Sequence, residues 1–431
     1  AQKMAPSSCF YFLISTFLLL LFVSIQEGNA EVPLTKTFKF VNRGVFSRYS
    51  GEYGATYRNL PIEASPFRLC FYNTTPNAFT LAIGIGSIRL EAGMKWIWDA
   101  NRRHLVKENA VFSFGQDGNL VLSDSDGTVA WQTATANQGV VALNLLPSGN
   151  LVLVDANGKF IWQSFDYPTD TLVNGMSLTY KGPKKLTARI SDKDGSDGQY
   201  TFQLEKTHWS LYYTSLRYYK SDEFADKDII ANLTYEVDSA TASSDPILVY
   251  RMLGSQSSES AFLRHIKYRA PYSVLRVGSN GNVMIYSFAN LPQPWETTYK
   301  LFDRDVGMDE CTLPGRCGSL GLCKDSQCVG CPRVGGSIGW SESCAPPRRA
   351  PCRGGGSAKY FEMEGVDHFL SAYNEGTGPV SLTECRSRCS RDCKCLGFFY
   401  QRKKSSCYLA PVLGSLHPVD DPTHVAYIRT A

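Results

Sequence analysis

An acidic and an amide side chain alternate at the start of a short repeated segment, and on one face of a strand such groups could hold the hydroxyls of a sugar. The segment GNLVLSDSDGTVAWQ (118–132) returns 31 residues later as GNLVLVDANGKFIWQ (149–163). Asp117 and Asn119 precede Val121 at this alternate spacing. Two interpretations are open. Either the repeat forms the wall of a sugar site, or its Gly and Asn residues serve only a turn and a core.

Other chemistry finds little support in the residue pattern. The histidines lie outside any nucleophile-elbow, metalloprotease or phosphate-loop context, so we expect no catalytic residues and no cofactor. Asp303 and Asp305 stand before a cysteine-rich block, as in calcium-binding modules, but Gly307 occupies a position where an acidic or amide ligand is needed. We therefore expect no metal site there.

Composition limits the class of protein. A chain of 431 residues has room for two to four domains, and 43% hydrophobic with 19% charged residues is typical of globular proteins. The net charge of +4 is well mixed along the chain, a field too weak to suggest nucleic acid or an anionic membrane as the main partner. Two basic loops, 181–185 and 401–406, are either solvated turns or contacts for acidic wall polysaccharide.

Residues 1–30 have the pattern of a secretion signal. Lys3 precedes the apolar run 9–25, and a small-x-small sequence predicts cleavage after Ala30. An uncleaved membrane anchor is the alternative, although the run is slightly short for a membrane span. We expect a secreted protein without a membrane anchor, in the extracellular space or cell wall. Sequons in turn-rich sequence predict N-glycans on Asn73 and Asn232.

Cysteine placement agrees with secretion. Of 14 cysteines, Cys9 leaves with the signal and twelve crowd between Cys311 and Cys407. Such density predicts a disulfide framework, with zinc as the alternative because 328–331 and 393–395 look like ligand pairs. Cys70 lies in an apolar segment, so we expect a buried free thiol there.

Short alternating segments separated by Gly-containing turns make residues 36–300 β-rich. Each repeat ends on a Trp-Gln pair, at Trp131 or Trp162, and Trp98 lies 33 residues before Trp131, close to the 31-residue offset of the repeat. Three such units must pack around a shared axis with the tryptophans inside, which describes a three-sided β-prism. A more distant copy at 281–296, ending near Trp295, suggests a second, diverged prism.

The chain changes character near Asp309. Six cysteines within 311–344 must hold a segment whose apolar content is too low for a core. Farther on, Ser381 and Glu384 form a capping box that predicts a helix, with Cys385 and Cys389 on one face. Alternating segments follow, so we expect a helix joined by disulfides to a small sheet.

These residues resemble a known arrangement of modules. The repeat followed by WQSFDYPTDTLVNGMSL (162–178) resembles the bulb-type mannose-binding lectin module, the six-cysteine block an EGF-like module, and ECRSRCSRDCKCLGFFY (384–400) a PAN/apple module. Their order is that of S-locus glycoproteins. Essentially the whole mature chain is similar to the plant epidermis-specific secreted glycoproteins of the curculin-like lectin family, which carry no kinase.

The resemblance implies a mainly β protein with lectin β-prisms, a disulfide-rich module and a small α+β module. The expected boundaries are a signal peptide (1–30), a bulb-type lectin domain (31–168), a second lectin-like domain (169–303), an EGF-like module (304–346) and a PAN/apple module (347–431).

It also implies a sugar site. The family's pocket reads Gln-x-Asp-x-Asn-x-Val-x-Tyr, in which Asp and Asn hold the 2-hydroxyl, Gln the 3-hydroxyl and Tyr the 4-hydroxyl, while Val packs on the ring. No copy here is complete, since the first lacks Gln and Tyr, the second keeps Asn and Val alone, and the third has Asn for Asp and Met for Val. The expected sugar contacts are Asp117, Asn119, Val121, Asn280, Asn282 and Tyr286.

The disulfide pairs implied by the family are Cys311–Cys323, Cys317–Cys328, Cys331–Cys344, Cys385–Cys407, Cys389–Cys395 and Cys352–Cys393. The implied function is a non-catalytic, lectin-like glycoprotein that binds mannose-rich glycans or glycoproteins weakly or through avidity. The alternative is a protein-interaction module whose lectin sites are inactive and whose partner is a protein or peptide.

Overall fold

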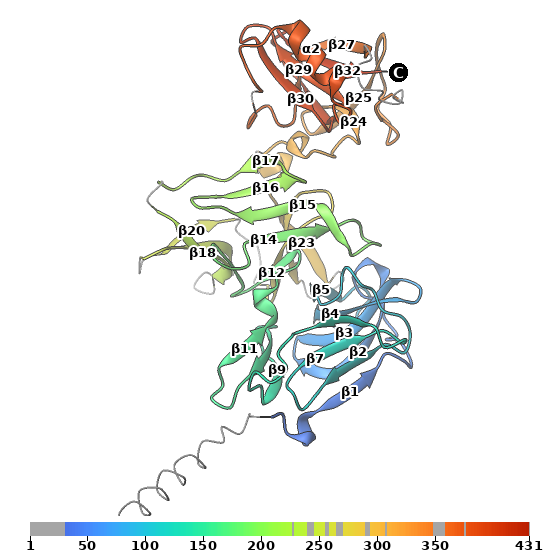
Figure 1. Cartoon of the computed structure of the whole chain (residues 1–431), viewed down its shortest axis with the longest axis vertical. Helices are drawn as coiled ribbons and strands as arrows, with labels where there is room; N and C mark the ends of the chain where they lie inside the picture. Colours follow the sequence, from blue (N-terminus) through green and yellow to red (C-terminus); the bar gives the residue numbers. More distant parts are fainter. Residues whose placement is uncertain are drawn as a thin grey trace, which may run out of the picture.

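The computed structural model describes residues 31–225, 228–238, 245–254, 258–263, 270–288, 294–306, 308–347, 358–374 and 376–430. Figure 1 shows two β-rich bodies in chain order, followed by a third, C-terminal body that carries the helix α2. The expected signal peptide lies outside the described residues. Within them the chain is mainly β, as predicted.

The first body is built from three antiparallel sheets that face one another. One contains β2 (Thr56–Ala64), β3 (Phe67–Thr75), β4 (Ala78–Gly86) and β5 (Met94–Asp99). The second contains β1 (Phe38–Val41), β6 (Val111–Phe114), β7 (Leu120–Ser123) and β8 (Val129–Gln132), and the third β9 (Ala142–Leu145), β10 (Leu151–Val154) and β11 (Phe160–Gln163). This is the predicted three-sided prism.

Three tryptophans meet at its centre. The ring centroids of Trp98, Trp131 and Trp162 lie 5.8–6.0 Å apart, and each pair has an edge-to-face geometry. Each sheet contributes one ring, opposite Ile83, Leu122 or Leu153 in the strand register. Edge-to-face contacts suit indole rings because the positive edge of one faces the negative face of another. The prediction from the repeat spacing is confirmed.

Residues 171–300 form a second set of three four-stranded sheets. Their strands are β12 (Thr171–Val173), β21 (Ser273–Val277), β22 (Val283–Phe288) and β23 (Trp295–Lys300); β13 (Ser177–Thr179), β18 (Ile230–Asp238), β19 (Asp245–Met252) and β20 (Ser258–Phe262); and β14 (Lys185–Arg189), β15 (Asp197–Leu204), β16 (Trp209–Tyr213) and β17 (Leu216–Lys220). The second prism therefore exists, although its core differs from the first.

Trp295 does not occupy the position of the central tryptophans. In the register of β22 and β23, Tyr299 stands opposite Ile285, as Trp131 stands opposite Leu122 in the first prism. Trp295 lies four residues earlier, where its indole N–H donates to the carbonyl of Gly93 in the first prism (3.3 Å). The spacing match misplaced this residue because the hairpin between β22 and β23 is longer.

Charged side chains are buried where the prisms meet. Glu52 of the first prism accepts from the guanidinium of Arg276 of the second (2.7 Å) and from the backbone N–H of Trp96 (3.1 Å), and it also pairs with Lys95. Burial alone would raise the pKa of Glu52, but the charges of Arg276 and Lys95 lower it.

A second ion pair crosses the same boundary. The guanidinium of Arg102 joins Asp99 (2.7 Å) of the first prism to Asp170 (2.5 Å) of the second, and all three side chains are no more than 6% exposed. Burial raises the pKa of Asp170, whereas Arg102 and Arg276 lower it to a final value of about 2. These pairs fix the two prisms to each other because breaking one would leave a charge without a partner in a low-dielectric interior.

The C-terminal body contains two sheets. One has the order β26 (Gly336–Ile338), β25 (Gln327–Arg333), β24 (Leu320–Lys324), β31 (Gly414–Pro418) and β28 (Val366–His368), and the other β27 (Tyr360–Glu364), β32 (His424–Arg429), β29 (Gly397–Gln401) and β30 (Ser406–Ala410). The helix α2 (Leu382–Arg391) begins after Ser381, whose hydroxyl accepts from the N–H of Glu384 (3.2 Å), as the capping box predicts. The expected EGF-like and apple segments share the first sheet, because β24 pairs in parallel with β31.

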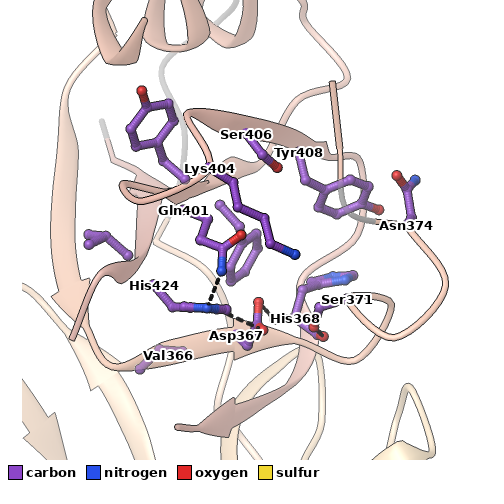
Figure 2. A pocket seen from close by; sticks show the side chains of 13 residues that line it. Val366, Asp367, His368, Ser371, Asn374, Gln401, Lys404, Ser406, Tyr408 and His424 are labelled. Atoms are coloured by element: carbon purple, nitrogen blue, oxygen red, sulfur yellow. Dashed lines mark hydrogen bonds and ion pairs between the residues drawn. The ribbon is translucent and has the colours of Figure 1, made fainter. Parts of the chain in front are cut away.

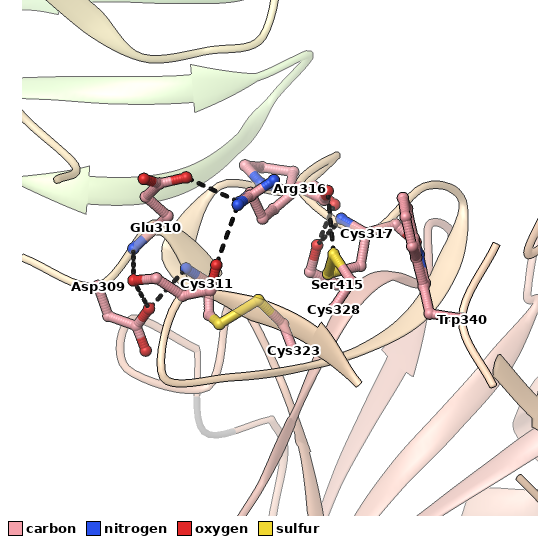
Figure 3. The surroundings of a disulfide bond; sticks show 11 residues. Asp309, Glu310, Cys311, Arg316, Cys317, Cys323, Cys328, Trp340 and Ser415 are labelled. Atoms are coloured by element: carbon pink, nitrogen blue, oxygen red, sulfur yellow. Dashed lines mark hydrogen bonds and ion pairs between the residues drawn. A yellow bond between two sulfur atoms is a disulfide. The ribbon is translucent and has the colours of Figure 1, made fainter. Parts of the chain in front are cut away.

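Disulfides hold this body together. The bonds are Cys311–Cys323, Cys317–Cys328, Cys331–Cys344, Cys385–Cys407 and Cys389–Cys395, the same pairs that the resemblance implied. Cys393 is also disulfide-bonded, and its expected partner Cys352 lies outside the described residues. Figure 3 shows that Ser415 of β31 also contacts this segment, since its hydroxyl accepts from the N–H of Cys317 (3.0 Å).

The zinc alternative is wrong for these cysteines, since a disulfide leaves no thiolate. Cys70 is free and buried, as expected.

Candidate carbohydrate-binding site

Each Gly-Asn pair of the repeat closes a turn that only glycine fits. Gly118, Gly149 and Gly281 have φ angles of +79°, +87° and +86°, in the left-handed region that favours glycine. A Cβ added at any of them would come within 2.6 Å of a side chain from a neighbouring segment. The repeated glycine is therefore explained by architecture alone.

The repeated asparagine clamps the turn to the next strand. The side-chain oxygen of Asn119 accepts from the N–H of Thr135 (3.1 Å), and its NH2 group donates to Gln132 (3.0 Å). Asn150 and Asn282 make equivalent pairs of bonds, to Phe165 and Gln163 and to both backbone groups of Phe302. The three side chains are 8%, 5% and 3% exposed. Structure thus accounts for the asparagine as well as for the glycine.

The first copy still presents a carboxylate. Asp117 is exposed, and one of its oxygens accepts from the N–H of Asn119 (3.1 Å). Val121 is half-buried on the outer face of β7, whereas its neighbours Leu120 and Leu122 are fully buried. An acidic acceptor and an apolar side chain therefore lie near an amide whose hydrogen-bonding groups serve the protein itself.

The structure separates the expected residues of the third copy. Tyr286 is half-buried at the boundary between the prisms, where the ammonium of Lys95 lies 4.0 Å from its ring centroid. Asn280 is exposed, with its side-chain oxygen accepting from the N–H of Asn282 (3.0 Å). A cavity of about 310 Å³ adjoins Asn280 and Asn282, but Tyr286 does not line it.

That cavity has walls that the sequence did not indicate. Lys300 of β23 stands opposite Met284 in the register, and Glu310 and Arg316 approach from the disulfide-rich module. Nothing in the spacing of the chain predicts that residues 310–316 fold over β22, because no repeat or motif links the two segments.

A second cavity, of about 100 Å³, lies in the C-terminal body (Figure 2). There His424 lies between Asp367, 3.0 Å from its Nδ1, and Gln401, 2.7 Å from its Nε2. Burial lowers the pKa of His368 to about 3, and the Nε2 of this neutral ring lies 2.8 Å from the carbonyl of Val412. Both imidazoles are engaged in bonds that hold the module together.

The sequons do not lie in turns, which corrects that part of the expectation. Asn73 lies in β3, two residues before its end, and its side-chain oxygen accepts from the hydroxyl of Thr56. Asn232 lies inside β18, where its side-chain oxygen is shielded from solvent and has no hydrogen-bond partner among the described residues. Asn73 is the more accessible acceptor because the side-chain oxygen of Asn232 is shielded from solvent, whereas that of Asn73 is bonded to an exposed threonine.

Comparison with known proteins agrees with this architecture. Residues 95–193 match the family model described as D-mannose binding lectin, and residues 364–420 match the PAN domain. EP1-like glycoprotein 2 of Arabidopsis thaliana is 42% identical over 97% of this chain and 99% of its own. Epidermis-specific secreted glycoprotein EP1 of Daucus carota is 44% identical over 80% of this chain and 95% of its own.

More distant matches are partial. The G-type lectin S-receptor-like serine/threonine-protein kinase SD2-5 of Arabidopsis thaliana is 27% identical over 80% of this chain but 41% of its own length. Among solved structures, a two-domain agglutinin of Scilla campanulata, a native fetuin-binding protein, aligns over 58% of this chain and 97% of its own at 13% identity. The TM-score of 0.21 is too low to carry an argument.

The prisms, the disulfide-rich segment and the PAN module together define a lectin-like glycoprotein. The identity and coverage of its relatives are specific enough to go further: the chain belongs to the family of EP1-like glycoproteins. Within the described residues, no helix has both the length and the apolar character that crossing a membrane requires.

Proposed function

We propose that this protein is a non-catalytic binding glycoprotein of the extracellular space and cell wall that holds mannose-rich glycans weakly. The observation that carries the proposal is the exposed carboxylate of Asp117 beside Asn119 and Val121, in a module whose family model is a D-mannose binding lectin. A carboxylate accepts a charge-assisted hydrogen bond from a sugar hydroxyl. Such a bond is stronger than the one that the same hydroxyl would donate to a neutral acceptor.

The expected affinity is low. The first copy lacks the Gln and Tyr of the family's pocket, which removes two contacts worth about 1 kcal/mol or more each. A dissociation constant near ~1 mM or weaker for one mannose unit follows. Several glycan branches on one surface would be needed to raise the overall strength of binding.

The test compares Asp117→Ala with the wild type on an immobilised high-mannose glycoprotein, with thermal unfolding as the folding control. We expect the variant to lose binding and keep its unfolding temperature, because the side chain is exposed and makes one local bond. Asn282→Ala is less informative about the sugar, since this amide clamps the backbone of Phe302. Undiminished binding by Asp117→Ala would exclude this copy as the site.

Secretion and glycosylation belong to the same proposal. We expect the mature chain to begin near Glu31 and to carry glycans on Asn73 and Asn232, with Asn73 more fully occupied because the side-chain oxygen of Asn232 is shielded from solvent. Intact-mass measurement before and after glycosidase treatment, with Asn73→Gln and Asn232→Gln variants, tests each site. An unchanged mass after treatment would disprove the glycosylation.

A protein-binding role is the second candidate, and a specific observation favours it. The amides of Asn119, Asn150 and Asn282 are all used inside the protein, which is the expected result if the repeat is architecture alone. The wild type would then fail to bind high-mannose glycoprotein, or its binding would be unaffected by free mannose.

A further inference from the structure

We propose that the cavity between the second prism and the disulfide-rich module is a separate ligand site, which binds a sugar carrying one carboxylate, such as a uronic acid residue of an acidic polysaccharide. The proposal does not depend on mannose binding at Asp117. It rests on the walls, the charge and the rigidity of this cavity.

The cavity lies between two modules and has the size of a small-ligand site. Its volume of about 310 Å³ falls at the lower end of the range for small-molecule pockets. Asn280, Met284 and Lys300 line it from the prism, and Glu310 and Arg316 from the module. Figure 3 shows Glu310 and Arg316 at the edge of the module that lies toward the strands of the second prism.

The two walls are held firmly against each other. Tyr200, 8% exposed, packs so closely on the turn that a Cβ at Gly281 would lie 2.6 Å from its ring. On the other side, a Cβ at Gly315 would lie 2.9 Å from the Tyr200 hydroxyl. One tyrosine is therefore packed against the prism turn and the module loop together, so the cavity is formed before any ligand arrives.

The charges in the cavity favour a single negative group. Arg316 pairs with Glu310 (2.8 Å) and donates to the carbonyl of Ser326 (3.0 Å), so its charge is compensated. Lys300 is half-buried, yet it has no acidic or hydrogen-bonding partner in the part of the chain that the structure describes. By contrast, the buried Lys95 pairs with Glu52. A partly desolvated ammonium without a counter-charge is stabilised by an incoming carboxylate.

The remaining groups suit a sugar ring better than other anions. Asn280 uses its side-chain oxygen internally, which leaves its NH2 group to donate, and Ser279 adds a hydroxyl. Met284 offers an apolar surface to the ring. A phosphate dianion would need a second uncompensated cation, and Arg316 is already paired. A carboxylate with hydroxyls around it matches this set.

The test measures binding of α-1,4-linked galacturonate oligomers to the full secreted protein by calorimetry, alongside the methyl-esterified oligomer and a neutral galactose oligomer. Lys300→Gln should weaken binding of the galacturonate oligomer by about tenfold or more, the loss of one charge-assisted bond. Lys324→Gln, an exposed lysine of the disulfide-rich module away from the cavity, is the matched control and should bind as the wild type does. Asn280→Asp should abolish binding by placing a second carboxylate opposite the ligand.

Each outcome decides the proposal. Equal binding of the methyl ester, or equal affinity of the Lys300 and Lys324 variants, would overturn it. Lys300-dependent binding of an acidic peptide without binding of the galacturonate oligomer would assign the cavity to a protein partner and also overturn it. Asp117→Ala should leave galacturonate binding unchanged, so failure at this cavity and failure of the mannose site are distinguishable.

Discussion

Replacing Glu52 by Gln is expected to destabilise the paired prisms severely. The change keeps the shape of the side chain but removes the carboxylate that balances two buried cations, Lys95 and Arg276. These cationic side chains are 7% and 4% exposed, so water cannot replace the lost partner. Breaking a buried ion pair by removing one member costs about 3–5 kcal/mol. For domains of this size the unfolding midpoint should fall by roughly 6–20 °C.

The measurement is urea and thermal unfolding followed by tryptophan fluorescence, which reports on the buried rings of the first prism. Glu63→Gln is the matched control, because Glu63 is 56% exposed where it pairs with Arg68, and surface pairs contribute about 0–1 kcal/mol. Adding Lys95→Met to Glu52→Gln should recover part of the loss, since it removes one uncompensated cation. A loss no greater than that of Glu63→Gln, or no recovery in the double variant, would refute the reasoning.

Three further results are expected. Gly149→Ala should cost more than 1 kcal/mol in chemical unfolding, because φ is +87° and the new Cβ would meet the ring of Phe67 at 2.6 Å; an unchanged midpoint would contradict this. Cys70 should resist thiol reagents in the native protein and react in urea, because it is buried and burial raises its pKa; rapid native labelling would show an open core. The free energy of unfolding should hold above pH ~5 and decrease as the pH drops from the unfolded-state carboxyl pKa of about 4 toward 2. The reason is that the folded-state pKa values of Glu52 and Asp170 are lowered. An unfolding midpoint that does not change with pH in this range would argue against these pairs.

Local signals in the sequence predicted much of the fold. The period of the repeat and its tryptophans were enough for the first prism, since three units that each carry one tryptophan at nearly the same spacing have few ways to bury one ring each. The capping box at Ser381 located the helix. Trp295 matches the repeat in spacing but not in position, because spacing along the chain does not measure hairpin length, and the register places Tyr299 in the core instead. The ion pairs between the prisms join residues far apart in sequence, so no local pattern could reveal them.

The candidate site was harder to predict. A Gly-Asn pair reads the same whether its amide faces a sugar or clamps a turn, and the structure shows the clamp at Asn119 and Asn282. Tyr286 matched the family's pattern, yet it packs against Lys95 of the other prism. The neighbouring residue across the module boundary decides between these roles. For Lys300 that boundary is with the disulfide-rich module, which no local pattern in the sequence places beside β23.

The parallel pairing of β24 with β31 has a consequence for biogenesis. Leu320 pairs with Gly414, so strand β24 is synthesised about ninety residues before its partner strand. During that interval Cys311–Cys323 and Cys317–Cys328 can already close, while one edge of the strand stays open to other chains. A chain that ends before residue 414 could therefore form these two disulfides and still leave one edge of β24 unpaired, so free thiols in this segment would not reveal that the sheet is incomplete.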